Sequence, residues 1–238
     1  RHCKSRKELT QFDTHVKGLR RRLLAELLAD ARRKPDYWFN KDRQLRFQTL
    51  LWGGDEICWV VPARAGWVTA ALFFDHTKDK QVGAWNWKGV PLSHAMGMVF
   101  CHHKAPIHRV THLAKMLADK AKACLPSDVR NQRDLAAYVV LESFDHAGLD
   151  LDDYLTDRYG PSIAWKDLVI PGDAMPKWIH CAMRLKDVLP RRRLVPVLRA
   201  ISFSGDITQA IRDLRSGIDT AALNAFVSAA RATPGGPD

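Results

Sequence analysis

The feature that most constrains this chain is a pair of short apolar runs separated by two glycines and two acids. Residues 45–52 read LRFQTLLW, residues 57–62 read ICWVVP, and Gly53-Gly54-Asp55-Glu56 stand between them. Runs this short and rich in Val, Ile, Trp and Phe are typical of strands, and a Gly-Gly pair between them is typical of a tight turn. Glycine also lets another molecule approach the backbone closely. The sequence therefore predicts a β-hairpin that holds two carboxylates at its tip, within reach of a phosphate-bearing ligand and its metal.

The rest of the chain alternates between helical and strand-like patterns. We expect loops at residues 37–43, 77–89 and 126–134. The other expected elements are, in order, a helix over 8–33, the hairpin, a helix over 64–76, a strand over 93–100, a helix from Pro106, a strand over 137–143, and helices over 173–189, 191–201, 206–216 and 219–231. A hairpin combined with helices between the other strands indicates an α+β fold. We expect a first domain over residues 1–160 and a small helical domain over residues 161–238.

Charge and composition narrow the class of protein. The 238 residues carry a net charge of +11, and residues 1–44 hold 13 Lys or Arg against 6 Asp or Glu. Such an excess indicates either an anionic partner, such as nucleic acid or nucleotide, or a solvated basic helix face. There is no apolar run of about 18 residues, so no membrane span is expected. Five scattered cysteines are typical of a reducing cytoplasm. Because the chain starts at Arg1 within charged sequence, we expect it to be a fragment, a processed product or part of a larger chain.

Gly-Gly-Asp-Glu taken alone also fits a solvated hairpin turn. Its setting between two strongly apolar strands changes this interpretation, because acids at such a position need a partner. A divalent cation is the usual partner, and Mg²⁺ prefers carboxylates together with substrate phosphates.

Three segments together resemble a known superfamily. Residues 50–56 are similar to the signature of the palm domain shared by GGDEF nucleotide cyclases and the large polymerase-like subunit of type III CRISPR effector complexes. Residues 93–107 are similar to the strand, His-x-Lys-x-Pro turn and helix start of the CRISPR palm, and Ala121-Lys122 matches the Ala-Lys that ends this helix in both branches. The resemblance spans residues 9–145. It implies a ferredoxin-like palm, followed by a helical domain of the CRISPR type.

The two branches differ at positions that this chain contains. A diguanylate cyclase has Phe where Ile57 stands, an Arg-x-x-Asp site before the hairpin, and Gly-Arg-Asn after the final Ala-Lys; all three are absent. The CRISPR branch has Gly-Gly-Asp-Asp, whereas the last residue here is Glu56. The CRISPR-type palm is the better match.

The resemblance implies metal-assisted nucleotidyl transfer with two Mg²⁺ or Mn²⁺ ions. Asp55 would be the main metal ligand and Glu56 a second one, while Gly53 and Gly54 would lie against base or ribose. Lys122 would neutralise the triphosphate, and Lys104 is a further phosphate contact. The superfamily's other metal-binding acid stands on a strand before the first long helix, and the sequence printed here begins at that helix.

The implied function is a cytoplasmic, antiviral CRISPR-associated enzyme that makes oligonucleotide messengers, cyclic oligoadenylates above all, from ATP. RNA and the protein subunits of an effector complex would be its partners. One alternative is an inactive palm that serves as a nucleotide- or RNA-complex-binding scaffold. Another is a diguanylate cyclase using GTP.

The sequence predicts structural roles, not binding roles, for two pairs of residues. His102 and His103 are adjacent, and adjacent side chains on an extended chain point in opposite directions, so we do not expect them to share a metal ion. Trp85 and Trp87 are expected to cover the core or a subunit contact in preference to stacking on a base.

Overall fold

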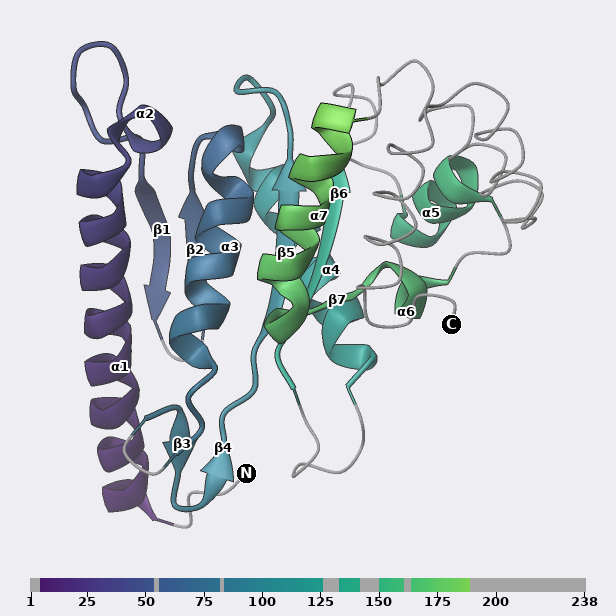
Figure 1. The fold of residues 1–238 in the computed structure, drawn as a ribbon. Coiled ribbons are helices and arrows are strands. Elements are labelled where there is room, and N and C mark those ends of the chain that lie inside the picture. The colour runs from purple at the N-terminus through teal and green to yellow at the C-terminus, as the bar shows by residue number, and fades with distance from the viewer. Residues whose placement is uncertain are drawn as a thin grey trace.

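The computed structural model describes residues 5–53, 56–81, 84–125, 133–141, 150–160 and 164–188 (Figure 1). The helices are α1 (Arg6–Arg33), α2 (Pro35–Trp38), α3 (Ala63–Thr77), α4 (Ile107–Ala123), α5 (Leu151–Tyr159), α6 (Trp165–Leu168) and α7 (Met175–Val188). The strands are β1 (Gln48–Gly53), β2 (Glu56–Val60), β3 (Asn86–Trp87), β4 (Val90–Pro91), β5 (Ala95–Phe100), β6 (Leu135–Val140) and β7 (Ile170–Pro171). The predicted α+β class is confirmed.

The strands of the described chain form three small sheets. β1 and β2 pair as an antiparallel hairpin, and β3 and β4 form a second, very short one. β5 and β6 are parallel neighbours joined through α4, and β7 pairs antiparallel with the other edge of β6. A parallel pair needs a crossover connection, and α4 supplies it.

Helix α1 ends at Arg33, as the sequence predicts, and begins at Arg6, two residues before the expected start. The Ser5 side chain accepts a hydrogen bond from the Glu8 backbone N–H at 3.2 Å, which caps the first turn. Lys34 stands before Pro35 and ends the helix, because the residue before proline avoids the helical region. Leu19, Leu23 and Leu27 form a buried stripe on the face that packs on the protein.

Two clusters of buried side chains make up the core. The first lies between α1, α3 and the strands, and it joins Leu23 and Leu27 of α1 to Phe73 and Phe74 of α3, with Trp59 of β2 packed against them. The second lies between α4 and the β5–β6 pair and contains Leu113, Leu117 and Val139, among others. Sheet β5–β6 therefore has helices on both faces, α3 with α7 on one and α4 on the other (Figure 1).

A buried charged cluster joins α3, β5 and β6 at one end of the molecule. Asp134, just before β6, accepts hydrogen bonds from Lys80 Nζ at 2.9 Å, His94 Nδ1 at 3.0 Å and Thr77 Oγ1 at 3.2 Å. It also accepts one from the His94 backbone N–H at 2.8 Å. The polar loop expected over residues 126–134 ends where β6 begins, and its last residue, Asp134, is 8% exposed and ties three elements together; residues 126–132 lie outside the described residues.

The cluster shifts the pKa of its members. Burial raises the pKa of Asp134, but hydrogen bonds and charge from His94 and Lys80 outweigh burial and leave that pKa lowered. Burial lowers the pKa of His94, and the charges of Lys80 and Arg20 lower it further, against the opposing effect of Asp134. Burial also lowers the pKa of Lys80. Since a carboxylate only accepts hydrogen bonds, His94 carries a proton on Nδ1.

Other elements differ in detail from the sequence expectations. The segment expected as a loop over 77–89 contains β3, and the loop expected over 37–43 begins inside α2. Trp85 is buried against the core, as predicted, and the Trp87 ring packs edge-on against Phe12 of α1 at 5.3 Å.

Contacts cross the expected domain boundary at residue 160, and the division into two domains stays a prediction. β7 pairs with β6, and α7 packs on α3, with Met175 and Ile179 in the first core cluster. The structure thus places residues 164–188 with the sheet and its helices. The helices expected over 191–231 lie outside the described residues.

Candidate functional site

The β1–β2 hairpin is present as the sequence predicts. Its register pairs Gly53 with Glu56 and Trp52 with Ile57. The two residues between Gly53 and Glu56 in the sequence, Gly54 and Asp55, lie outside the described residues. Of the four residues of the predicted turn, the structure therefore describes the first and the last, Gly53 and Glu56.

Aromatic packing fixes the hairpin on one face only. Trp59 contacts Phe47 at 5.4 Å, Trp52 at 5.9 Å and Phe73 of α3 at 6.5 Å between ring centroids. Leu51 stands on the opposite side and is 44% exposed. One face of the hairpin is thus held against the helices while the other stays open to a ligand or partner.

The backbone at Gly53 is accessible. A Cβ placed on Gly53 would meet no atom within 4 Å among the described parts of the chain. The space beside this end of the hairpin is therefore not filled by neighbouring side chains, and a base or a ribose can approach the backbone there.

Glu56 connects the hairpin to α4. Its Oε1 lies 3.7 Å from Lys115 Nζ, and both side chains are more than half exposed. An exposed ion pair of this kind contributes little stability. The ion pair shows that the end of the hairpin lies beside the middle of α4. The Glu56 carboxylate is accessible there to water or a cation.

Lys122 lies on the same face of α4 as Lys115. Seven residues are two helical turns, so the two lysines stand about 10 Å apart along the helix axis on one side. Lys122 is exposed in the last turn. No motif marks Lys115, and its seven-residue spacing to Lys122 is the sequence signal that could link it to the site.

Lys104 occupies a different place. It sits in the turn between β5 and α4, where its backbone N–H donates to His102 Nδ1 at 3.3 Å. Helix α4 then runs 17 residues, about 25 Å, before it ends beyond Lys122. Lys104 and Lys122 are therefore at opposite ends of α4. We group Glu56 with Lys115, which it contacts, and with Lys122 two turns along the same side of α4; Lys104 lies at the other end of the helix.

The histidine pair also differs from expectation. His102 and His103 stand in a turn and not on extended chain, and their ring centroids are 4.1 Å apart. The predicted opposite orientation of the two side chains is therefore wrong. Within the described part of the chain, no group of three or more His, Cys, Asp or Glu side chains is placed to hold a metal ion.

The hairpin supplies some of the ligands that a hard divalent cation needs. Glu56 supplies an exposed carboxylate with one weak partner, and carboxylate oxygens are the donors that Mg²⁺ and Mn²⁺ take. Its neighbour Asp55 would add a second carboxylate from the same turn. The hairpin thus supplies donors of the right chemistry for divalent cations that also contact phosphate oxygens.

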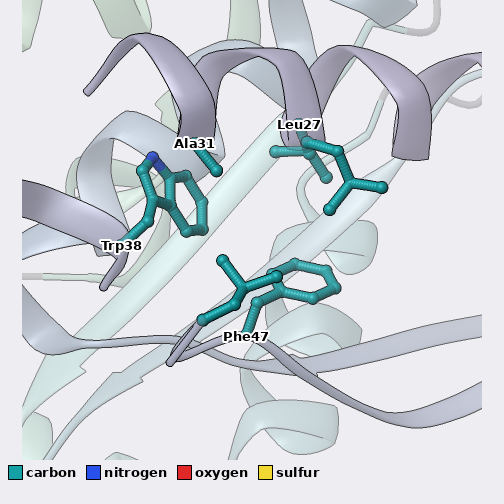
Figure 2. A pocket seen from close by; sticks show the side chains of 6 residues that line it. Leu27, Ala31, Trp38 and Phe47 are labelled. Atoms are coloured by element: carbon teal, nitrogen blue, oxygen red, sulfur yellow. The ribbon is translucent and has the colours of Figure 1, made fainter. Parts of the chain in front are cut away.

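A separate depression between α1 and the start of the hairpin is apolar (Figure 2). Its lining residues are Leu27, Leu28, Ala31, Trp38, Leu45 and Phe47. The one polar atom that Trp38 brings, Nε1, already donates to Asp30 Oδ2 at 3.1 Å. With no polar group left to orient a ligand, this depression is part of the packing and not a candidate nucleotide site.

Comparisons of this chain with protein-family models, with curated proteins and with solved structures found no match. In the part of the chain that the structure describes, no helix has the length and apolar character needed to cross a bilayer.

Proposed function

We propose that this chain is a palm-type nucleotidyltransferase module that uses ATP and Mg²⁺ or Mn²⁺ to make oligonucleotide messengers. The observation that carries the proposal is the hairpin end itself: Gly53 open, Glu56 exposed, and both beside the lysine face of α4. The motif resemblance of residues 50–56 and 93–107 supports the same class. The palm or ferredoxin-like topology, the helical domain after it, and the CRISPR effector setting with its RNA and protein subunits are parts of this proposal.

Each residue of the group has a role in such a reaction. Asp55 and Glu56 would hold the divalent cations, which when bound activate a ribose hydroxyl and neutralise charge on the α-phosphate. Gly53 leaves its backbone open for base or ribose, and Gly54, the next residue in the sequence, would lie against the same group. Lys122, a mobile point charge on α4, would neutralise the phosphates that leave. Lys115 would release Glu56 when a cation takes the carboxylate, because their exposed pair is weak.

A second candidate is a palm that binds nucleotide or an RNA complex without turnover. It is favoured by one observation: among the described residues, the group holds a single carboxylate, that of Glu56. Two-metal chemistry needs enough ligands to hold both ions about 4 Å apart. The third candidate, a GTP-using diguanylate cyclase, shares the hairpin with the first.

Product analysis separates the three candidates. The protein is incubated with labelled ATP or GTP and Mg²⁺ or Mn²⁺, with and without guide and target RNA, and the products are resolved. Oligoadenylates support the first candidate and cyclic di-GMP the third. Nucleotide binding without product supports the scaffold.

The double variant Asp55→Ala with Glu56→Ala is the decisive comparison. We expect it to abolish product while the circular dichroism spectrum and melting temperature stay unchanged, since Glu56 is exposed. Undiminished synthesis by this folded variant would overturn the assignment of the hairpin as the metal site.

A further inference from the structure

The outer side of helix α1 carries a dense row of cations. Of the eight exposed charged residues of this helix, seven are Lys or Arg and only one is acidic. Lys7, Arg21 and Arg32 are 14 and 11 residues apart, close to four and three whole helical turns, so they lie on one side. Together with Arg22 and Arg33 they form a basic ridge, which runs about 37 Å from Lys7 to Arg32.

The basic ridge faces away from the protein. Helix α1 lies at one edge of the molecule (Figure 1). Its buried stripe of Leu19, Leu23 and Leu27 packs on the core. All five residues of the basic ridge are exposed. A ligand can therefore reach the whole length of the helix from the side opposite the core.

Most charges of the basic ridge lack a counterion within the protein. Arg33 lies 3.8 Å from Asp30, a buried carboxylate that it shares with Lys34 at 3.1 Å. The described parts of the chain offer no ion-pair partner to Lys7, Arg21 or Arg32. Cations crowded on one helix repel one another, so they cost stability in the free protein and release that cost when an anion binds.

The loop after α2 adds cations at the C-terminal end of α1. Lys41, Arg43 and Arg46 are exposed on this loop. Asn40 and Gln44 hold it closed: the Gln44 N–H donates to Asn40 Oδ1 at 2.8 Å, and Asn40 Nδ2 donates to Gln44 Oε1 at 2.9 Å. Because these bonds already order the loop, its cations lose less conformational freedom when they meet a ligand.

The chemistry of these cations favours phosphate as the anion. Four of the five residues of the basic ridge are arginines, and two of the three loop cations are as well. The planar guanidinium group donates two parallel hydrogen bonds to a phosphate, which an ammonium group does not. A surface that serves solubility alone mixes charges of both signs. A row of one sign, rich in arginine, instead fits a row of phosphates.

The absence of aromatic groups selects the form of the phosphate polymer. Helix α1 exposes no aromatic side chain. Proteins that bind single strands stack the unpaired bases on aromatic rings, and protein interfaces centre on buried aromatic anchors. A double helix keeps its bases inside and presents its phosphates outside, so it needs neither. One turn of a double helix spans about 34–36 Å, close to the length of the basic ridge.

We propose that the basic ridge of α1, extended by Lys41, Arg43 and Arg46, docks on the phosphate backbone of a nucleic-acid duplex without reading its sequence. The basic ridge shares no residue with the group of Glu56, Lys115 and Lys122, and the proposal does not depend on the nucleotidyltransferase activity. RNA and DNA duplexes present the same phosphate chemistry, and the experiment distinguishes them.

Fluorescence anisotropy with labelled nucleic acids tests the proposal. The 238-residue chain is titrated into a 20-bp RNA duplex, a 20-bp DNA duplex and a 20-nucleotide single-stranded RNA, each in two unrelated sequences. We expect the two sequences of a duplex to bind within about twofold of each other, and the preferred duplex to bind at least about fivefold tighter than the single strand. The affinity should fall steeply between 50 and 200 mM salt.

A double variant locates the surface. Arg21→Gln with Arg32→Gln should weaken duplex binding at least about tenfold at 50 mM salt. For the DNA duplex, it should also reduce the slope of log affinity against log salt by about 1.8, because each lost phosphate contact accounts for about 0.9. The matched control, Arg109→Gln with Lys177→Gln, removes the same charge from exposed positions of α4 and α7 and should change the affinity less than about twofold. Circular dichroism checks that both variants are folded.

Four outcomes would overturn the proposal. Failure of either duplex to bind at 50 mM salt would show that α1 is a solvated basic helix. Tighter binding of the single strand would exclude a duplex as the ligand. Equal losses in the two double variants would show that the affinity follows total charge and not the basic ridge. Displacement of the duplex by polyglutamate at equal charge concentration would assign the basic ridge to an acidic protein.

Discussion

Gly97 lies so close to α4 that a Cβ there would be 1.9 Å from the carbonyl oxygen of Ala114. The backbone N of Ala118 would be 2.7 Å away. Both neighbours are main-chain atoms of a regular helix, so they cannot move aside without shifting α4. The absence of a side chain at Gly97 therefore sets the distance between β5 and the helix that carries Lys115 and Lys122.

The change Gly97→Ala should lower the free energy of unfolding by at least about 2 kcal/mol, since the added methyl group forces helix and strand apart. Urea denaturation measures this. Gly18→Ala is the matched control: Gly18 is an exposed position of α1 where a Cβ meets nothing within 4 Å, and the change should stabilise the protein by about 0.5–1 kcal/mol. Equal effects at both glycines would contradict the packing explanation.

Asp134→Asn should cost about 3 kcal/mol at neutral pH, because it removes the charge that balances Lys80 in a buried setting. The pKa of Asp134 is lowered in the folded state, so its contribution is complete above the unfolded value of about 3.9 and is lost as pH falls through the lower folded value. The stability gap between the natural chain and the variant should therefore narrow below about pH 4. Thermal unfolding from pH 7 to pH 3 checks this, and a gap independent of pH would exclude the charge as its cause.

His94 should make the protein less stable in mild acid. Its pKa is lowered by burial, so the unfolded chain takes up a proton first as pH falls below about 6.5. Stability should then fall by up to about 1.4 kcal/mol per pH unit until the folded pKa is reached. His94→Gln removes this titration and should flatten the profile between pH 6.5 and 5. Parallel profiles for both proteins would show that another group titrates.

Trp38→Phe should cost about 1–3 kcal/mol, since the indole Nε1 that donates to Asp30 is lost and leaves a buried carboxylate oxygen without its donor. Trp178→Phe is the control: Trp178 is 37% exposed on α7, and its change should stay within about 0.5 kcal/mol. Denaturant titrations of the two variants, followed by circular dichroism, compare them directly.

The sequence predicted the elements whose local pattern is strong. The bounds of α1, α3 and the hairpin lie within a few residues of those expected, because apolar periodicity, Pro35 and the paired glycines specify them locally. Long-range partners were not predictable in this way. The burial of Asp134 depends on its contacts with Lys80 and His94, which lie 54 and 40 residues away in the sequence. No local sequence pattern predicts these contacts.

The candidate site shows the same division. The hairpin and Lys122 were identified from motifs, but the pairing of Glu56 with Lys115 depends on where α4 packs across β5. Lys104 and Lys122 looked equivalent as phosphate contacts, because each is a lysine in a matched motif. Only the length and direction of α4 separate them.

That separation gives the last prediction. If nucleotide triphosphate binds beside the hairpin end, Lys122→Ala should weaken ATP binding about tenfold or more, since an ion pair with phosphate is lost near the site. Lys104→Ala, at the other end of the same helix, should change the affinity less than twofold. Both lysines are exposed, so neither change should alter the melting temperature of the free protein appreciably. Isothermal titration with a non-hydrolysable ATP analogue and Mg²⁺ measures the two affinities. A larger loss at Lys104 than at Lys122 would move the triphosphate to the β5–α4 turn and away from Glu56.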